Sequence, residues 1–145
     1  MKNYRNVRIV FIAPMAFTME NDILDHLDEH GIPYTVTTDL TEVIADLDAI
    51  YVTRIQAEHD IAGESQKIDL SRFTISSKEL GAMKEDAVII NTARGGIINE
   101  QDLYDVMQSG HLGGAAIDVF DFEPYSGPLR EIQRCLLTSH MGSMS

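Results

Sequence analysis

Three polar residues in the second half of the chain could together carry out acid–base chemistry on a small acid. Arg94 stands in the run Asn-Thr-Ala-Arg-Gly-Gly at 91–96, Glu123 precedes a proline, and His140 ends the run Thr-Ser-His at 138–140. A histidine oriented by a carboxylate is a general acid/base pair, and an arginine can bind an anionic substrate through two N–H groups. On spacing alone, this catalytic hypothesis and three unrelated loop residues are equally good interpretations.

Each of these residues follows a short apolar run that is typical of a strand covered on both faces. Such runs occur at 7–13, 34–37, 49–53, 87–91, 115–119 and 135–138, with helix-period segments between most of them. This alternation predicts parallel βαβ units. We therefore expect residues 1–145 to form a single α/β domain in three layers, α/β/α, with a doubly wound, Rossmann-like, mostly parallel sheet in strand order 3-2-1-4-5-6. A flavodoxin-type sandwich is the alternative.

Local sequence signals mark two of the helices. Ser76 and Glu79 have the spacing of a capping box, which predicts a helix from there to about residue 84. Asn99 is a good N-cap for a further helix, and Gly110 is a good terminator for it.

Ligands bind beyond the carboxyl ends of parallel strands, so the residues after each strand are the other candidates. Arg54 and Gln56 follow the third strand and could hold a carboxylate, although solvated loop residues are an equally good interpretation. The turn at 14–18 lacks glycine, and the first glycine of the chain is Gly31. Without the G-x-G-x-x-G turn, ordinary NAD affinity is not expected. Asp39 stands where a ribose-binding acid would lie, but a helix cap is the preferred interpretation.

The composition excludes several classes of partner. The 145 residues carry a formal net charge of −12, which disfavours nucleic acid and anionic membrane surfaces. A single cysteine excludes a disulfide framework and a multi-thiolate metal site. His26, His30, His59 and His111 are interpreted as surface residues, so no metal site is expected. The sequence predicts neither a signal peptide nor a bilayer-spanning run, and a cytoplasmic location is the expectation.

The motifs resemble two known families. Residues 7–56 resemble the aspartate-binding domain of aspartate carbamoyltransferases, through Phe-Ile-Ala-Pro at 11–14, Leu-Asp-His-Leu-Asp-Glu-His-Gly at 24–31 and Tyr-Val-Thr-Arg-Ile-Gln at 51–56. Residues 73–145 resemble the NAD-binding domain of D-2-hydroxyacid dehydrogenases of the phosphoglycerate type. The matching runs there include Asn-Thr-Ala-Arg-Gly-Gly at 91–96, Ala-Ile-Asp-Val-Phe at 116–120 and Thr-Ser-His at 138–140.

The resemblances imply roles for individual residues. In the dehydrogenases, Arg94 would bind the carboxylate and carbonyl of a 2-oxo acid, His140 would be the proton donor and Glu123 its partner. Asp118, with Thr92 and Ala93, would contact the cofactor, Asp118 through the nicotinamide carboxamide. Ser139 replaces the family's usual proline. In the carbamoyltransferases, Arg54 and Gln56 would hold aspartate.

Two resemblances in one chain give the leading hypothesis of an engineered or recombined chimera. Its halves, 1–56 and 73–145, would meet at a seam within 57–72 and form a folded scaffold without a cofactor and without efficient catalysis. One alternative is an NAD-dependent D-2-hydroxyacid dehydrogenase module that retains weak binding of nicotinamide or a 2-oxo acid. Another is a module that binds small carboxylates. Weak self-association is also expected, through former interface surface.

Overall fold

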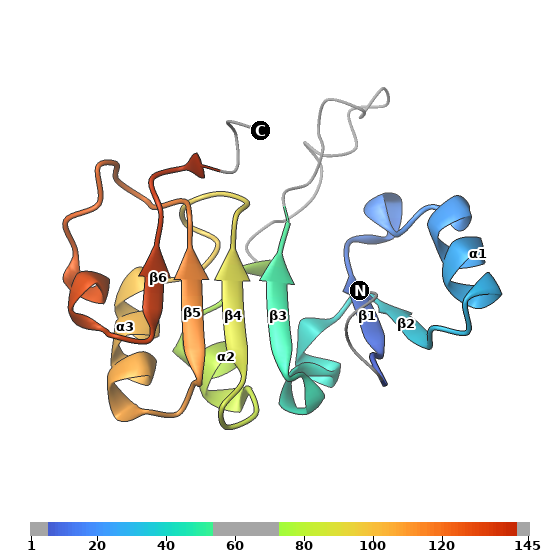
Figure 1. Cartoon of the computed structure of the whole chain (residues 1–145), viewed down its shortest axis with the longest axis horizontal. Coiled ribbons are helices and arrows are strands. Elements are labelled where there is room, and N and C mark those ends of the chain that lie inside the picture. The colour runs from blue at the N-terminus through green and yellow to red at the C-terminus, as the bar shows by residue number, and fades with distance from the viewer. Residues whose placement is uncertain (1–5, 54–72, 142–145) are drawn as a thin grey trace. The chain divides into compact units, whose positions relative to one another are not determined.

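The computed structural model describes residues 6–53 and 73–141 of the chain (Figure 1). These residues fall into two compact units. Unit 1 contains the described residues 6–40, and unit 2 contains 41–53 together with 73–141. The predicted seam at 57–72 lies outside the described residues.

Unit 1 is built on one pair of parallel strands. β1 (Ile9–Ile12) pairs with β2 (Tyr34–Thr37), in a register that joins the first residues of the two strands and the last. A 3-10 turn, η1 (Met15–Phe17), and the helix α1 (Asn21–Glu29) connect the strands. α1 buries Leu27, and Gly31 follows the helix with a φ of +61°, a conformation that glycine adopts without strain.

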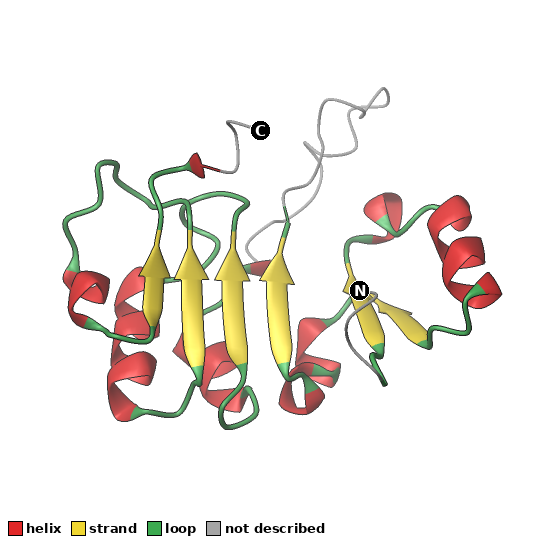
Figure 2. Cartoon of the chain, in the orientation of Figure 1, coloured by secondary structure: helices red, strands yellow, loops and turns green. Residues whose placement is uncertain are grey.

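Unit 2 contains a four-stranded parallel sheet in the order β3-β4-β5-β6 (Figure 2). Its strands are β3 (Ala49–Val52), β4 (Val88–Asn91), β5 (Gly114–Ile117) and β6 (Cys135–Leu137). Two helices accompany it, α2 (Ser77–Ala82) and α3 (Glu100–Ser109). Short 3-10 turns, η2 (Leu40–Glu42), η3 (Ile44–Asp46) and η7 (Pro128–Glu131), complete the unit. η2 begins at the last residue of unit 1.

The predicted helix boundaries are confirmed where local capping fixes them. The Glu79 carboxylate accepts hydrogen bonds from the N–H and the hydroxyl of Ser76 at 3.1 and 2.6 Å, which starts α2. The Asn99 side chain accepts the N–H of Asp102 at 2.9 Å and starts α3, and Gly110 ends α3 with a φ of +83°. These groups satisfy N–H and C=O groups that a helix end leaves unpaired.

The parallel α/β, Rossmann-like architecture is confirmed, but the predicted strand order is wrong. β1 was expected beside β4; instead β3 pairs with β4, with Ala49 opposite Val88, and β1 pairs only with β2 among the described strands. A bond from the Val88 N–H to the Asp48 carbonyl (3.0 Å) extends the β3–β4 ladder, and Lys84 reaches the Asp48 carboxylate at 2.6 Å. These contacts between residues distant in sequence select the neighbour of β4, and hydrophobic periodicity does not report them.

In the described part of unit 2, the two faces of the sheet differ in what covers them. Ile50, Ile89 and Ala115 lie in register on one face of the sheet and are buried. α2 and α3 lie behind the sheet in Figure 1, and the residues buried most completely include Leu80, Leu103 and Met107 from these helices. The opposite face carries an apolar row of half-buried or exposed residues: Tyr51, Ile90, Ala116 and Leu136. Among the described residues of unit 2, helices therefore cover one face.

Candidate functional site

Three segments leave the carboxyl ends of neighbouring strands in unit 2. They follow β4, β5 and β6, at the arrow tips of the parallel sheet in Figure 1. Residues 92–98, 118–127 and 138–141 belong to these segments, and they include most of the candidate residues predicted from the sequence. This edge is where open parallel sheets bind ligands.

Asn91, the last residue of β4, shapes the segment that carries Arg94. Its side chain is 2% exposed; its amide oxygen accepts the Ala93 N–H and its amide nitrogen donates to the Arg94 carbonyl, both at 3.0 Å. Arg94 itself is exposed, and one guanidinium nitrogen donates to the Ala93 carbonyl at 3.2 Å. This role of Asn91 was not predicted, although an amide at the end of a buried apolar run is a signal that the sequence contains.

Gly95 brings the segments after β4 and β5 into direct contact. A Cβ atom at this position would lie 2.2 Å from the Phe120 carbonyl oxygen, so only glycine permits the approach. The segment with Arg94 is therefore held against the segment that leads to Glu123.

Asp118 holds the segment that carries His140. The side chain is buried, with 5% of its surface exposed, and one carboxylate oxygen accepts the Thr138 hydroxyl and the Met141 N–H at 2.5 and 2.8 Å. The His140 N–H donates to the Asp118 carbonyl at 2.9 Å. The resemblance implied only a cofactor contact for Asp118, and the structure adds this positioning role.

His140 and Glu123 form a hydrogen-bonded pair. His140 Nδ1 lies 3.3 Å from a Glu123 carboxylate oxygen, and the two side chains are 42% and 40% exposed. The other carboxylate oxygen accepts the Phe120 N–H at 3.3 Å, and Glu123 is joined to Pro124 by a cis peptide bond. His140 has a φ of +57°, in the left-handed region that few non-glycine residues occupy. The structure thus brings together the acid–base pair predicted from the sequence.

A second contact ties the segment after β5 to a helix. Glu100, in the first turn of α3, accepts the Asp121 N–H at 2.8 Å. Burial raises the pKa of the Glu100 carboxyl above its usual range, and the nearby Asp121 carboxylate adds to this rise. Within the segment itself, Tyr125 stacks on Phe120 with ring centroids 4.3 Å apart.

Thr92 and Ala93, the two other predicted cofactor contacts, differ in whether their side chains are exposed. Thr92 is exposed, and its hydroxyl lies 2.9 Å from the Tyr51 hydroxyl of β3. Ala93 is 2% exposed, so its main chain rather than its methyl group is the part available for recognition. The predicted carboxylate ligands Arg54 and Gln56 lie outside the described residues.

Taken separately, the carboxyl edge of unit 2 offers polar groups that fit a nicotinamide, and the turn after β1 in unit 1 does not fit a pyrophosphate. At the edge of unit 2, Asp118 and Thr92 provide polar oxygens, and the His140–Glu123 pair supplies a proton donor. In unit 1, the connection after β1 is a 3-10 turn without glycine, and Met15 there is 79% exposed. A pyrophosphate needs close backbone approach through glycine. Asp39, for which a helix cap was preferred to a ribose-binding role, donates its N–H to the Thr37 hydroxyl at 3.2 Å.

The carboxyl edge of the parallel α/β sheet thus carries an exposed arginine after β4 and a histidine–carboxylate pair in the segments after β5 and β6. A profile of the family described as D-isomer specific 2-hydroxyacid dehydrogenase, NAD binding domain, matches residues 66–142. The chain belongs to this family.

Curated relatives come from both families that the sequence resembles. D-3-phosphoglycerate dehydrogenase of Methanocaldococcus jannaschii is 38% identical over 74 residues, covering 50% of this chain and 14% of the relative. The aspartate carbamoyltransferase catalytic subunit of Vibrio vulnificus is 34% identical over 91 residues, covering 63% of this chain and 29% of the relative. The chain spans less than a third of the length of either relative.

Solved structures of dehydrogenases share the fold. The holo form of Rhodotorula graminis D-mandelate dehydrogenase matches with a TM-score of 0.72 and 26% identity, over 95% of this chain and 35% of that one. An NAD-binding D-isomer specific 2-hydroxyacid dehydrogenase from Polaromonas matches with a TM-score of 0.67 and 24% identity, over 95% of this chain and 37% of that one.

These comparisons change the balance between the hypotheses. The NAD-binding family favours the module that retains nicotinamide binding over the leading hypothesis of a scaffold without cofactor or efficient catalysis. The carbamoyltransferase match covers 63% of the chain, and the match to the Escherichia coli D-3-phosphoglycerate dehydrogenase covers 62%. The two matches therefore overlap and do not by themselves place a seam.

Among the residues that the structure describes, every helix is too short or too polar to span a membrane.

Proposed function

We propose that the chain provides the nicotinamide-binding and proton-transfer part of an NAD-dependent D-2-hydroxyacid dehydrogenase. The observation that supports this most directly is the 3.3 Å pair of His140 and Glu123, which lies at the sheet edge that also bears Arg94. The family of the chain supports the same assignment.

Different residues at this edge would bind the substrate and transfer the proton. The exposed Arg94 guanidinium would bind the substrate carboxylate, because a planar cation matches a carboxylate through two hydrogen bonds. Glu123 accepts the hydrogen bond from His140 Nδ1, which assigns proton exchange with the substrate to Nε2. The carboxylate also stabilises the imidazolium form that donates the proton.

In the direction of 2-oxo acid reduction, bound NADH would supply a hydride to the carbonyl carbon. His140 would donate its Nε2 proton to the carbonyl oxygen, which yields the 2-hydroxy acid. Asp118 and Thr92 would orient the nicotinamide through its carboxamide, and Asp118 would at the same time hold His140 in place through the Thr138 and Met141 contacts.

Binding should be weak and should depend on the nicotinamide end. We expect NADH to bind the full chain with a dissociation constant of about 100 μM, or about −5.5 kcal/mol. Reduced nicotinamide mononucleotide should bind almost as well, because the turn after β1 lacks the glycines that hold a pyrophosphate. Fluorescence titration measures both constants.

Matched variants locate the binding site. Arg94→Ala and Asp118→Asn should weaken NADH binding in the presence of a 2-oxo acid by about tenfold, or about 1.4 kcal/mol. Arg130→Ala is the control, because it removes an exposed arginine that precedes β6 rather than following it. A flat NADH titration up to millimolar concentration would contradict the proposal, and so would equal losses in Arg94→Ala and Arg130→Ala.

The catalytic part of the proposal has its own test. His140→Gln should abolish NADH oxidation by 2-oxo acids while leaving the NADH dissociation constant within about twofold, since the change removes a proton donor and not a cofactor contact. Binding without any turnover in the unchanged chain would remove the catalytic role and leave the binding role.

The carbamoyltransferase relatives support a further proposal about descent. We propose that residues 7–56 share ancestry with the aspartate-binding domain and residues 73–145 with the dehydrogenases. The support is the similarity to both families, 34% and 38% identity to their respective members.

A further inference from the structure

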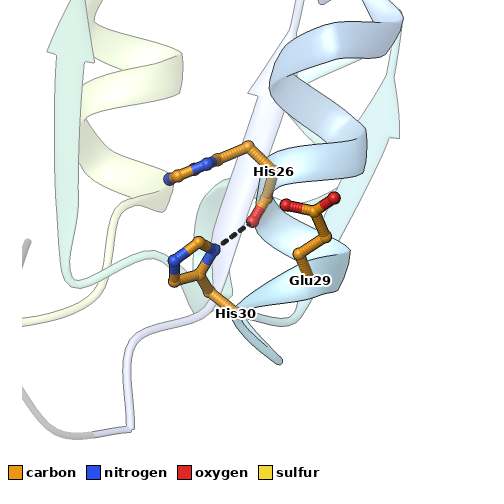
Figure 3. A group of neighbouring side chains, drawn as sticks. All are labelled: His26, Glu29 and His30. Atoms are coloured by element: carbon orange, nitrogen blue, oxygen red, sulfur yellow. Dashed lines mark hydrogen bonds between the residues drawn. The ribbon is translucent and has the colours of Figure 1, made fainter.

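A second group of polar side chains lies in unit 1, at the end of α1. His26, Glu29 and His30 each offer a ligand atom, and these atoms all lie within 4.8 Å of one another (Figure 3). The three side chains are exposed. The two imidazole rings lie on the same side of the helix, with centroids 4.1 Å apart and planes tilted by 37°. The spacing of three and four residues places such side chains on one helical face.

One hydrogen bond fixes which nitrogen of His30 can bind a cation. His30 Nδ1 lies 2.8 Å from the His26 carbonyl oxygen, as the dashed line in Figure 3 shows. A carbonyl oxygen only accepts hydrogen bonds, so Nδ1 carries the proton and Nε2 carries the lone pair in the neutral ring. Metal-binding histidines characteristically donate their other ring N–H to a carbonyl or carboxylate in this way.

The local charge also favours a cation. His30 is the C-cap of α1, where the helix dipole presents partial negative charge. The helix sequence Asn-Asp-Ile-Leu-Asp-His-Leu-Asp-Glu carries three aspartates besides Glu29, in a chain whose net charge is −12. Such a potential raises the local concentration of cations.

We propose that His26, Glu29 and His30 form a binding site for a divalent transition metal ion of the Zn²⁺ type, with water completing the coordination. Two imidazole nitrogens and one carboxylate oxygen are a donor set that Zn²⁺ accepts. In tetrahedral coordination, ligand atoms about 2.0–2.2 Å from one ion lie about 3.3–3.6 Å apart. The three exposed side chains would therefore rotate on binding, so that Nε2 of His30 comes within this distance of the other two ligand atoms. Both histidines were expected to be surface residues without a metal role, because the chain has no second soft ligand; the helical spacing of His26 and His30 with Glu29 is the signal in the sequence that points to the site.

Calorimetric titration of the full chain with ZnCl₂ tests the site. One Zn²⁺ should bind, and His26→Gln or His30→Gln should each weaken binding by about tenfold or more, because a chelate loses one of its arms. Glu29→Gln is compared with Asp25→Asn, which removes the same charge from the same helix outside the cluster. Glu29→Gln should weaken binding more than Asp25→Asn does. Equal losses would overturn the three-ligand site.

Nuclear magnetic resonance of the imidazole nitrogens separates coordination from general attraction. Zn²⁺ should shift the Nε2 resonance of His30 strongly and leave its Nδ1–H in place, since Nδ1 bonds the His26 carbonyl. Mg²⁺, which prefers oxygen ligands, should not compete. Circular dichroism checks that the variants keep α1. Unchanged Zn²⁺ affinity in the His26→Gln/His30→Gln double variant would overturn the proposal, as would a shift confined to His111.

Discussion

Two buried polar side chains, rather than the exposed candidate residues, set the geometry of the carboxyl edge. Asn91 and Asp118 are 2% and 5% exposed, and they lie at the ends of neighbouring strands β4 and β5. Asn91 bonds both sides of the turn to Arg94, and Asp118 bonds both sides of His140. Buried polar groups that are fully bonded specify one arrangement, because any alternative leaves them unpaired at a cost.

Removing the Asp118 carboxylate should therefore destabilise the fold as well as the site. We expect Asp118→Ala to lower the free energy of unfolding by about 1–3 kcal/mol, because the Met141 N–H and the Thr138 hydroxyl lose their acceptor. Asp118→Asn keeps one oxygen and should lose less. Urea denaturation measures both values, and a loss in Asp118→Ala below about 0.5 kcal/mol would be the size of an ordinary surface substitution and would contradict this role.

Cys135 in β6 gives a prediction about pH. Burial raises the pKa of its thiol from 9.0 to about 11. At pH 8 the native thiol should react with iodoacetamide more slowly than the same thiol in urea, because the thiolate is the reactive form. Between about pH 9 and 11 the unfolded chain loses this proton before the folded chain does, so this group lowers the free energy of unfolding as the pH rises.

The single cysteine of the chain makes the measurement direct. All alkylation reports on Cys135, and no second thiol needs to be removed. Equal rates of alkylation in the native and urea-unfolded protein at pH 8 would contradict the raised pKa.

The helices and the strand order differ in how far the sequence predicts them. α2 and α3 begin at Ser76–Glu79 and Asn99 as expected, because their caps are made by residues within three positions of one another. The pairing of β3 with β4 depends on contacts such as Val88 to Asp48, which are forty residues apart along the chain. Periodicity reports the type of an element and the face it buries, but it does not report the neighbour of a strand.

The candidate site was predictable for a related reason. Parallel strands deliver the residues that follow them to one edge, so Arg94, Glu123 and His140 were expected there whatever the strand order. The supporting role of Asn91 was not predicted, because it depends on how a turn folds back onto one side chain. The contact between Gly95 and Phe120 was missed because it joins two separate segments.

Gly95, in the segment after β4, and Gly81, in α2, allow a matched test of the contact between Gly95 and Phe120. We expect Gly95→Ala to destabilise the chain by about 1–3 kcal/mol, because its Cβ would lie 2.2 Å from the Phe120 carbonyl oxygen. Gly81→Ala, in α2 with nothing within 4 Å, should be neutral or stabilise by up to about 1 kcal/mol. Thermal unfolding of both variants measures the difference, and a tolerated alanine at 95 would contradict the close contact.

The two compact units differ in how much internal packing stabilises each of them. Unit 2 has a four-stranded sheet and two helices with a row of fully buried side chains, including Leu80, Ile89 and Leu103. The described part of unit 1 has one strand pair and one α-helix, and β1 has no fully buried residue. A two-stranded sheet is marginal in water without further packing.

Hydrogen exchange of the full chain should reveal this difference. Backbone amides of β4 and β5 should exchange at least about tenfold more slowly than those of β1 and β2, a difference of about 1.4 kcal/mol in opening free energy. Mass spectrometry of peptides from the four strands measures it. Equal protection of both strand pairs would show that the two units open together, contrary to this expectation.

His140 has a left-handed backbone conformation that its side chain disfavours. Glycine would adopt this φ of +57° without a clash, and a side chain there costs about 1 kcal/mol. Replacing His140 by glycine would remove this conformational cost, but it would also remove the imidazole. In the proposed function, His140 would therefore combine a strained main chain with the imidazole that donates the proton.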